Sequence, residues 1–484
     1  MRNASIPWEE GSDGVARYSR CRYYVRDYEE VISLLPADPS APVLAPPLDT
    51  NTTTCSSWHY DRSLYTNTVV SEWNLVCEDR WLMSSAQASY MAGFMVGALV
   101  LSELADKYGR RTLLLWSTLL FTVTTIATYF STSYLMFITF RFFVAAFGSG
   151  VFLSNYVILM ESLGLHSRTL FGVLYHIFFT TGICILALLG YLYRDWRDLQ
   201  LASSLPTILL LSYYFLTPES PRWLMMEGRH EEALVILRRM AKFNRGSLPQ
   251  QQQLQLYIDV IDRERHKKYA PSSFKEKCFW FMQSQLTLVR TPNMRRRCLI
   301  TFFAWFVISM IYYGLAFNGG NLNLPPYVLM TTNGVVEFVA CFSTIWILNV
   351  CGRRLSLCIL LVVCGVACLV IVFIPVELSW VNMVLSSVGR FFIAPGFTVV
   401  FMYSVELVPT HVRNVAIGTS SMCARIGSGI APYIVDLLGA VHYAVPSTVF
   451  GGFAVTAGLL SLLLPETGKQ RLPESIKEIE AMPR

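Results

Sequence analysis

The chain has 484 residues, of which 53% are hydrophobic and only 15% are charged. Soluble domains carry about 25% charged residues, so this composition, gathered into many long apolar runs, excludes a soluble globular protein and predicts an integral membrane protein. The formal net charge of +6 does not indicate a nucleic-acid partner, because the basic residues lie in alternate loops between the apolar runs.

The first 81 residues are polar and precede the apolar runs. Asn3 and Asn51 each begin an N-glycosylation sequon, and the same region carries Cys21, Cys55 and Cys77. Disulfides and N-glycans form on the oxidising side of a membrane, so we interpret residues 1–81 as an extracellular cap. No cysteine spacing in the sequence resembles a zinc site, and we expect neither a metal nor another cofactor.

Eleven apolar segments follow the cap, each close to the length of about 20 residues that crosses the hydrocarbon core of a bilayer. Their short connections at 106–111, 161–168, 352–354 and 406–413 fall on one side and are basic, which marks that side as the cytosol. The expected spans are 82–102, 112–131, 134–160, 170–192, 199–217, 298–317, 327–350, 355–375, 380–404, 415–438 and 443–464.

A long polar stretch separates the fifth expected span from the sixth. Residues 231–242 within it carry apolar side chains at helical spacing, which is typical of an amphipathic surface helix. The sequence therefore predicts a transmembrane bundle at 82–217, a cytoplasmic linker at 218–297, a second bundle at 298–464 and a cytoplasmic tail at 465–484.

The two halves repeat the same features in the same order and at a nearly constant separation. Gly109, followed by two arginines, returns as Gly352, and Arg141-Phe-Phe returns as Arg390-Phe-Phe. The other repeated features are Glu161 with Arg168, which return as Glu406 with Arg413, and Pro218-Glu219, which returns as Pro465-Glu466. A duplicated membrane bundle is a transporter architecture, so we expect alternating access of two bundles around a central cavity.

Charged residues in the short cytosolic connections recur in both halves. We expect them to link helices at the cytosolic face, to hold a cytosolic gate shut and to separate when the gate opens. The alternative is simple positive-inside topology with solvated ion pairs that contribute little. The candidate gate residues are Asp106, Arg110, Arg111, Glu161 and Arg168 in the first half, and Arg353, Arg354, Glu406 and Arg413 in the second.

Ionisable side chains inside the spans are costly to bury and are usually functional. Arg425 lies near the middle of 415–438 and Glu337 near the middle of 327–350, so we expect both at the depth of the cavity. The alternative for each is a structural ion pair inside its bundle. For Arg141 and Arg390 we favour that structural role.

Aromatic residues at helical spacing are candidates for the cavity wall. Aromatic faces bind organic cations and flat apolar bodies alike, although residues with this spacing also serve as ordinary packing. The candidates are Trp305, Tyr312 and Tyr313 in 298–317, Phe397 and Phe401 in 380–404, and Phe179 in 170–192.

Five motifs stand at the cytosolic ends of the expected spans: Asp106-Lys-Tyr-Gly-Arg-Arg111, Pro218-Glu-Ser-Pro-Arg-Trp-Leu224, Tyr403-Ser-Val-Glu406, Pro409-Thr-His-Val-Arg-Asn414 and Pro465-Glu-Thr-Gly468. Together they resemble the major facilitator superfamily, and closely the solute carrier 22 family of organic cation, anion and carnitine transporters. The resemblance implies an all-α membrane fold of two pseudo-symmetric six-helix bundles, here with eleven predicted transmembrane helices. It also implies a secondary active or facilitative transporter in the cell membrane.

The resemblance also bears on the charge of the substrate. Arg425 falls where anion and carnitine transporters of the family carry arginine and organic cation transporters carry aspartate. Tyr313, Phe397 and Phe179 match aromatic substrate-contacting positions of the anion branch, whereas Glu337 resembles the glutamate of the cation and carnitine branches. The resemblance therefore implies organic anions or carnitine-like zwitterions as substrates, with organic cations as the alternative.

In that family a large glycosylated loop with cysteines follows the first transmembrane helix, and residues 1–81 resemble that loop. We therefore expect a truncated gene model or isoform of a twelve-helix protein, and a truncated, non-transporting regulatory isoform is a further alternative. The sequence has no Walker A, metalloprotease or nucleophile-elbow pattern, so we expect neither ATP-driven transport nor an enzyme. The expected partners are a small organic ion and the lipid bilayer, with a coupling ion or counter-substrate left open and no nucleic acid.

Overall fold

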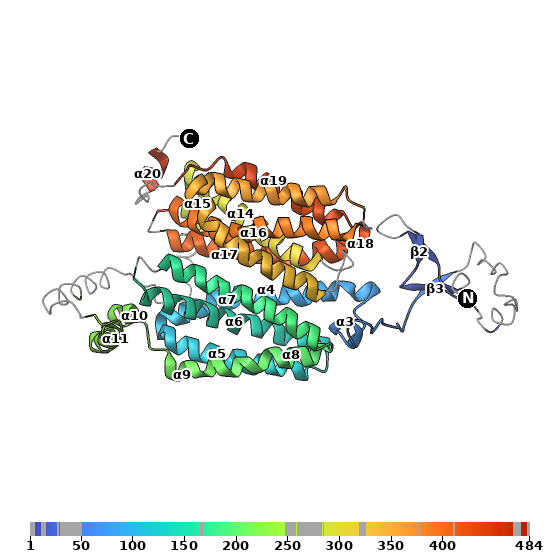
Figure 1. Ribbon diagram of the computed structural model, residues 1–484, viewed down its shortest axis with the longest axis horizontal. Coiled ribbons are helices and arrows are strands. Elements are labelled where there is room, and N and C mark those ends of the chain that lie inside the picture. The colour runs from blue at the N-terminus through green and yellow to red at the C-terminus, as the bar shows by residue number, and fades with distance from the viewer. Residues whose placement is uncertain are drawn as a thin grey trace.

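The membrane part of the protein, in this computed structural model, consists of two helical bundles that lie side by side (Figure 1). Short strands and α3 (Val69–Glu72) project beyond one end of the bundles, and α10 (Pro221–Met226), α11 (His230–Phe243) and α20 (Ile476–Ala481) lie beyond the other. The structure describes residues 5–10, 16–26, 29, 51–164, 168–246, 258, 283, 285–318, 326–375, 378–409, 412–467 and 476–481.

The N-terminal bundle depends on small residues where its helices cross. A Cβ atom at Gly93 would lie 2.1 Å from the carbonyl oxygen of Phe142, and one at Gly97 would lie 2.3 Å from that of Ala146. Only glycine at these two positions allows α4 and α6 to approach so closely. The helices of this bundle are α4 (Arg80–Tyr108), α5 (Arg110–Ala127), α6 (Tyr134–Ser162), α7 (Arg168–Leu192), α8 (Trp196–Ser204), η3 (Leu205–Ser212) and α9 (Tyr213–Leu216).

The C-terminal bundle is packed around α14, whose side chains are buried along most of its length. The expected spans 327–350 and 355–375 form one long element, α15. It bends at Gly352, where φ is +73° and the conformation is not helical. The helices of this bundle are α14 (Pro292–Phe317), α15 (Pro326–Ile371), α16 (Ser379–Leu407), α17 (Arg413–Tyr433), the π-helical turn η5 (Ile434–Leu438), α18 (Gly439–Val441) and α19 (Val445–Ser461).

Among the described residues, eight helices are long and apolar enough to cross a membrane, and two further apolar helices, Ile177–Leu192 and Val445–Ser461, are shorter. Each apolar segment expected from the sequence lies largely on helix. The expected span 199–217 is divided among α8, η3 and α9, and Pro206 at the start of η3 accounts for the interruption, because proline cannot donate a helical hydrogen bond.

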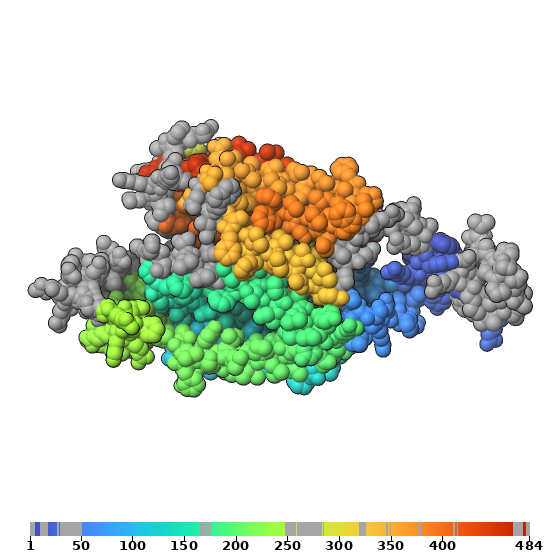
Figure 2. All heavy atoms as spheres, in the orientation of Figure 1, coloured from blue at the N-terminus to red at the C-terminus, as the bar shows by residue number. Residues whose placement is uncertain are grey.

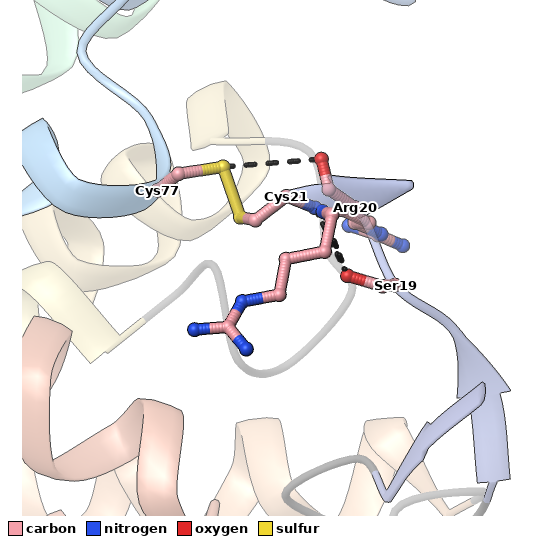
Figure 3. Close-up of a disulfide and its surroundings, with 5 residues drawn as sticks. Ser19, Arg20, Cys21 and Cys77 are labelled. Atoms are coloured by element: carbon pink, nitrogen blue, oxygen red, sulfur yellow. Dashed lines mark hydrogen bonds between the residues drawn. A yellow bond between two sulfur atoms is a disulfide. The ribbon is translucent and has the colours of Figure 1, made fainter. Parts of the chain in front are cut away.

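The cap contains two small antiparallel sheets. Strand β1 (Trp8–Glu10) pairs with β2 (Ala16–Tyr18), and β3 (Arg22–Tyr24) pairs with β4 (Thr52–Thr54). A disulfide joins Cys21, directly before β3, to Cys77, the first residue of the short turn η1 (Cys77–Asp79) that leads into α4 (Figure 3). The hydroxyl of Ser19 accepts hydrogen bonds from the amides of Cys21 and Arg22 and so fixes the turn that leads into the disulfide.

The cap is anchored to the N-terminal bundle through Glu72 of α3. Its carboxylate forms an ion pair with Arg197 of α8 and accepts a hydrogen bond of 2.6 Å from the indole of Trp196. Burial raises the pKa of Glu72, but the hydrogen bonds from Arg197 and Trp196 outweigh burial and hold that pKa below its usual range. The carboxylate therefore stays ionised at neutral pH, which preserves its ion pair with Arg197.

Candidate functional site

The two bundles meet along α4 with α17 and along α7 with α15. Figure 2 shows the yellow side chains of α15 seated against the green side chains of the N-terminal bundle. At the end near the cap, Ser84 donates a hydrogen bond to Asp436, and the hydroxyls of Ser85 and Tyr433 lie 2.9 Å apart. These contacts join the bundles at that end.

Close approach of α7 and α15 depends on Gly334. A Cβ atom there would lie 2.6 Å from the Sγ of Cys184 on α7. Nearer the cap, the rings of Tyr191 and Tyr327 make an edge contact with their centroids 5.3 Å apart. The bundles are therefore in direct van der Waals contact at the end of the molecule that carries the cap.

Arg425 lies at the α4–α17 contact. Its guanidinium carbon is 4.1 Å from the centroid of the Phe94 ring on α4, so the cation stacks on an aromatic face contributed by the other bundle. Its Nε is buried and has no hydrogen-bond partner. No carboxylate of the described part of the chain forms a salt bridge with this guanidinium, which leaves its charge uncompensated there.

Arg141 on α6 brings a second guanidinium toward the same face of α4. Its Nη2 donates a hydrogen bond of 3.0 Å to the amide oxygen of Gln87, and its carbon lies 5.1 Å from the centroid of Tyr90. Tyr90 precedes Phe94 by one helical turn, so the two arginines flank one aromatic stripe of α4. The partner of Arg141 that the structure describes is a neutral amide.

Glu337 on α15 is in a different situation, because it is paired. Its Oε2 lies 2.9 Å from the Nη2 of Arg390 on α16, and the hydroxyl of Tyr312 donates to both carboxylate oxygens at 3.0 Å. The side chains of Glu337 and Arg390 are only 10% and 4% exposed. The charge of Glu337 is therefore neutralised inside its own bundle, which is the structural arrangement expected for Arg390.

The candidate aromatic residues of the C-terminal bundle form one cluster. Tyr312 contacts Tyr313 and Phe397 with ring centroids 5.3 Å apart in both cases. Trp305 makes edge contacts with Phe397 and Phe401 and donates its indole N–H to Ser404. Phe179 is half-exposed on α7 of the other bundle. The cluster joins the Glu337–Arg390 pair through Tyr312.

The candidate gate residues of the first half lie together at the end opposite the cap. Arg110 pairs with Asp106 at 2.8 Å and lies 3.7 Å from Glu161, whose carboxylate accepts a hydrogen bond from Ser220. Arg111 donates its Nε and Nη2 to the carbonyls of Thr217 and Tyr214. The backbone of Arg168 begins α7, and its side chain lies outside the described part of the structure.

The second half repeats this arrangement. The Nε of Arg353 lies 3.3 Å from the carboxylate of Glu406, which also accepts a hydrogen bond of 2.5 Å from the hydroxyl of Thr467. Arg413 begins α17 and donates to the carbonyl of Val408. The backbone amide of Arg354 donates to the carboxylate of Glu466. Each network joins helices within its own bundle, the first in the N-terminal bundle and the second in the C-terminal bundle.

Two residues of these networks were missed by the sequence analysis. The carboxylate of Glu219 accepts from the backbone amide of Arg111 at the start of α5, and that of Glu466 accepts from the amides of Arg353 and Arg354. Each glutamate therefore caps a helix N-terminus, where an anion is favoured. The sequence did contain a signal for this pairing, because Pro218-Glu219 and Pro465-Glu466 repeat at nearly the same separation as Gly109 and Gly352.

A model of the family described as "Sugar (and other) transporter" matches residues 45–479. An organic cation transporter protein of Drosophila melanogaster is 38% identical over 462 residues, which cover 95% of this chain and 81% of that protein. The human solute carrier family 22 member 13 is 36% identical over 426 residues, covering 88% of this chain and 74% of the relative. The chain belongs to the solute carrier 22 family.

The fold agrees with solved structures of the xylose transporter XylE from E. coli. The inward open conformation has a TM-score of 0.63 at 16% identity and covers 83% of this chain and 89% of that chain. The partially occluded inward open conformation has a TM-score of 0.61 at 14% identity, with 82% and 90% covered. This solute carrier 22 member is therefore an all-α, multi-pass membrane transporter with the major facilitator fold, as the resemblance implied, and not an enzyme.

Family membership supports an organic ion transporter, and the alternative of a non-transporting regulatory isoform receives no support from these relatives. Two relatives from Drosophila melanogaster are named for a substrate charge, as an organic cation transporter protein and an organic cation transporter-like protein. The names of the other relatives, which include solute carrier family 22 members 2 and 3 and members 6-A and 6-B from Xenopus laevis, state no substrate charge.

Proposed function

We propose that this protein carries organic anions or carnitine-like zwitterions across the cell membrane by alternating access of its two bundles. The observation that carries the proposal is the contrast between Arg425 and Glu337. Arg425 stacks on Phe94 between the bundles with its buried Nε unpartnered, whereas the carboxylate of Glu337 is held by Arg390 and Tyr312.

The uncompensated charge beside Phe94 is therefore positive. Arginine does not release its proton in proteins, and an unpaired guanidinium in a site of low dielectric is costly to bury. A substrate carboxylate would compensate the charge of Arg425 and accept two hydrogen bonds from its planar fork. Arg141, whose described hydrogen bond goes to neutral Gln87, adds to the positive potential. A bare organic cation would be repelled by both.

The alternative is an organic cation transporter, which the names of two relatives favour. In that case Glu337 would have to exchange Arg390 for the substrate. The mutual pairing of these two buried side chains opposes that exchange, because it would leave Arg390 buried without its carboxylate.

The test compares uptake of an aromatic carboxylate, carnitine and a quaternary ammonium without an acid group. We expect Arg425→Lys to reduce uptake of the carboxylate about tenfold, because charge survives but the bidentate geometry is lost, and Arg425→Asp to abolish it. Ile426→Ala, a change on the exposed side of α17, is the matched control. If the wild type transports the quaternary ammonium best and Arg425→Lys leaves that activity intact, the protein is a cation transporter.

We also propose that the cap lies outside the cell and that the linker and the C-terminal tail lie in the cytosol. The basic connections and the Cys21–Cys77 disulfide support this orientation. Asn51 is exposed beside β4, whereas Asn3 lies outside the described residues. Glycosidase treatment should increase the electrophoretic mobility of the wild type and leave that of Asn51→Gln less changed. Protease access to the cap only in permeabilised cells would contradict the orientation.

A further inference from the structure

Helix α11 presents two different faces. Ala233 is buried against Trp223 and Leu224 of α10, and Ile236 packs against the same cluster. Leu234 is also buried, so the protein itself covers part of the apolar stripe that the sequence predicted. The opposite face is exposed and becomes basic toward the end of the helix. It carries Val235, Arg238, Arg239, Lys242 and Phe243, with the side chain of Phe243 89% exposed.

The acidic residues of α11 lie at its other end. Glu231 and Glu232 occupy the first turn, and Glu232 is paired with Arg229 at 2.6 Å. The second half of the helix has no acidic residue to balance Arg238, Arg239 and Lys242. Phe243 thus lies exposed beside three cations that form no salt bridge with the described residues, and this is the composition of an interfacial segment that binds an anionic lipid surface.

The position of α11 fits this partner. The indole N–H of Trp223 on α10 donates to the carbonyl of Asp106 at the end of α4, and Ser220, which caps α10, donates to Glu161 at the end of α6. These two bonds attach the α10–α11 pair directly to the ends of membrane-spanning helices. Figure 1 shows α11 beyond those ends and nearly end-on, so that its axis runs across the direction of the spans.

We propose that the basic face of α11, formed by Arg238, Arg239, Lys242 and Phe243, binds the headgroups of anionic phospholipids in the adjoining leaflet. The lipid would hold α11 against the bilayer and so steady the α10 contacts with Asp106 and Glu161. This inference does not depend on the charge of the transported substrate. It requires only that the protein is embedded in a membrane.

The test uses the purified full chain in nanodiscs of phosphatidylcholine alone or with about 30% phosphatidylserine, followed by hydrogen exchange of α11. Both leaflets of a nanodisc contain the anionic lipid, so the result is independent of orientation and of transport. We expect amides of 234–243 to exchange at least about fivefold more slowly with phosphatidylserine, the factor that corresponds to one basic residue near an anionic surface. High salt should remove the difference.

The variant Arg238→Gln/Arg239→Gln/Lys242→Gln should lose the lipid effect, and Phe243→Ala should reduce it. The matched control is Arg229→Gln, which removes a charge already paired with Glu232 on the same helix and should retain the effect. Equal exchange in both lipid mixtures would overturn the proposal. Protection by a soluble acidic peptide but not by phosphatidylserine would overturn it too and would indicate an acidic protein partner instead.

Discussion

At the scale of single residues, similar ionisable groups have opposite surroundings. Glu337 and Arg390 compensate each other inside one bundle, whereas Arg425 meets the other bundle through an aromatic ring. The sequence alone raised both possibilities for Glu337 and Arg425 and could not choose. The partner of Glu337 lies 53 residues away on another helix, and only the packing of α15 against α16 brings the two together. The roles of both residues in binding substrate stay a prediction.

The pairing of Glu337 with Arg390 predicts a stability defect when one partner is removed. Arg390→Leu should destabilise the protein by about 3–5 kcal/mol, because it leaves a buried carboxylate without its cation. Tyr312→Phe removes only a hydroxyl hydrogen bond and should cost about 1–2 kcal/mol. Thermal unfolding in detergent measures both effects. The double variant Glu337→Gln/Arg390→Leu should recover much of the loss, and a double variant as unstable as Arg390→Leu would show that the pair is not the cause.

At the scale of elements, the repeated glycine turns and the repeated Pro-Glu motifs form one unit. Gly109 and Gly352 have φ values of +100° and +73°, and a Cβ atom at either position would crowd the carboxylate of Glu219 or Glu466. Each glutamate then caps the helix that begins after its glycine. The sequence predicted the turn and the repeat, but not the cap, because more than 100 residues separate each glutamate from the amides that it binds.

We propose that these networks act as gate elements, and the unequal exposure of their members predicts unequal effects. The side chain of Asp106 is 75% exposed and that of Glu161 is 17% exposed. An exposed ion pair contributes little, whereas Glu161 also accepts a hydrogen bond from Ser220. Glu161→Gln should therefore reduce the uptake rate severalfold at normal surface expression, and Asp106→Asn should reduce it less. Equal wild-type uptake by both variants would contradict a gate role.

At the scale of the whole molecule, span lengths and the internal repeat predicted the two bundles, and the resemblance of the cytosolic motifs predicted their family. The contacts between the bundles could not be predicted in the same way. They depend on single side chains such as Ser84, Asp436 and Gly334, which follow no periodic pattern. The π-helical turn that carries Asp436 also has no signature in the sequence beyond Pro432 just before it.

The close approach of Gly334 and Cys184 predicts that the bundles can be locked together. Gly334→Cys would bring a second thiol next to the Sγ of Cys184, within the range in which a disulfide forms after small adjustments. Oxidation should abolish uptake, because α7 and α15 could no longer separate during alternating access, and a reductant should restore it. Gly334→Cys/Cys184→Ser is the control. Unchanged uptake by a variant whose disulfide is proven by mass spectrometry would mean that these helices do not separate.

The anchor between Glu72 and Arg197 has a mechanical consequence. Thr66 donates a backbone hydrogen bond to Arg194, and Trp196 donates one to Asn67. This part of the cap is therefore rigidly attached to the N-terminal bundle. When the two bundles rotate relative to each other, this part of the cap must move with the N-terminal bundle. A fluorophore pair on the cap and on α18 would therefore turn each transport cycle into a change of distance that can be followed in real time in a single molecule.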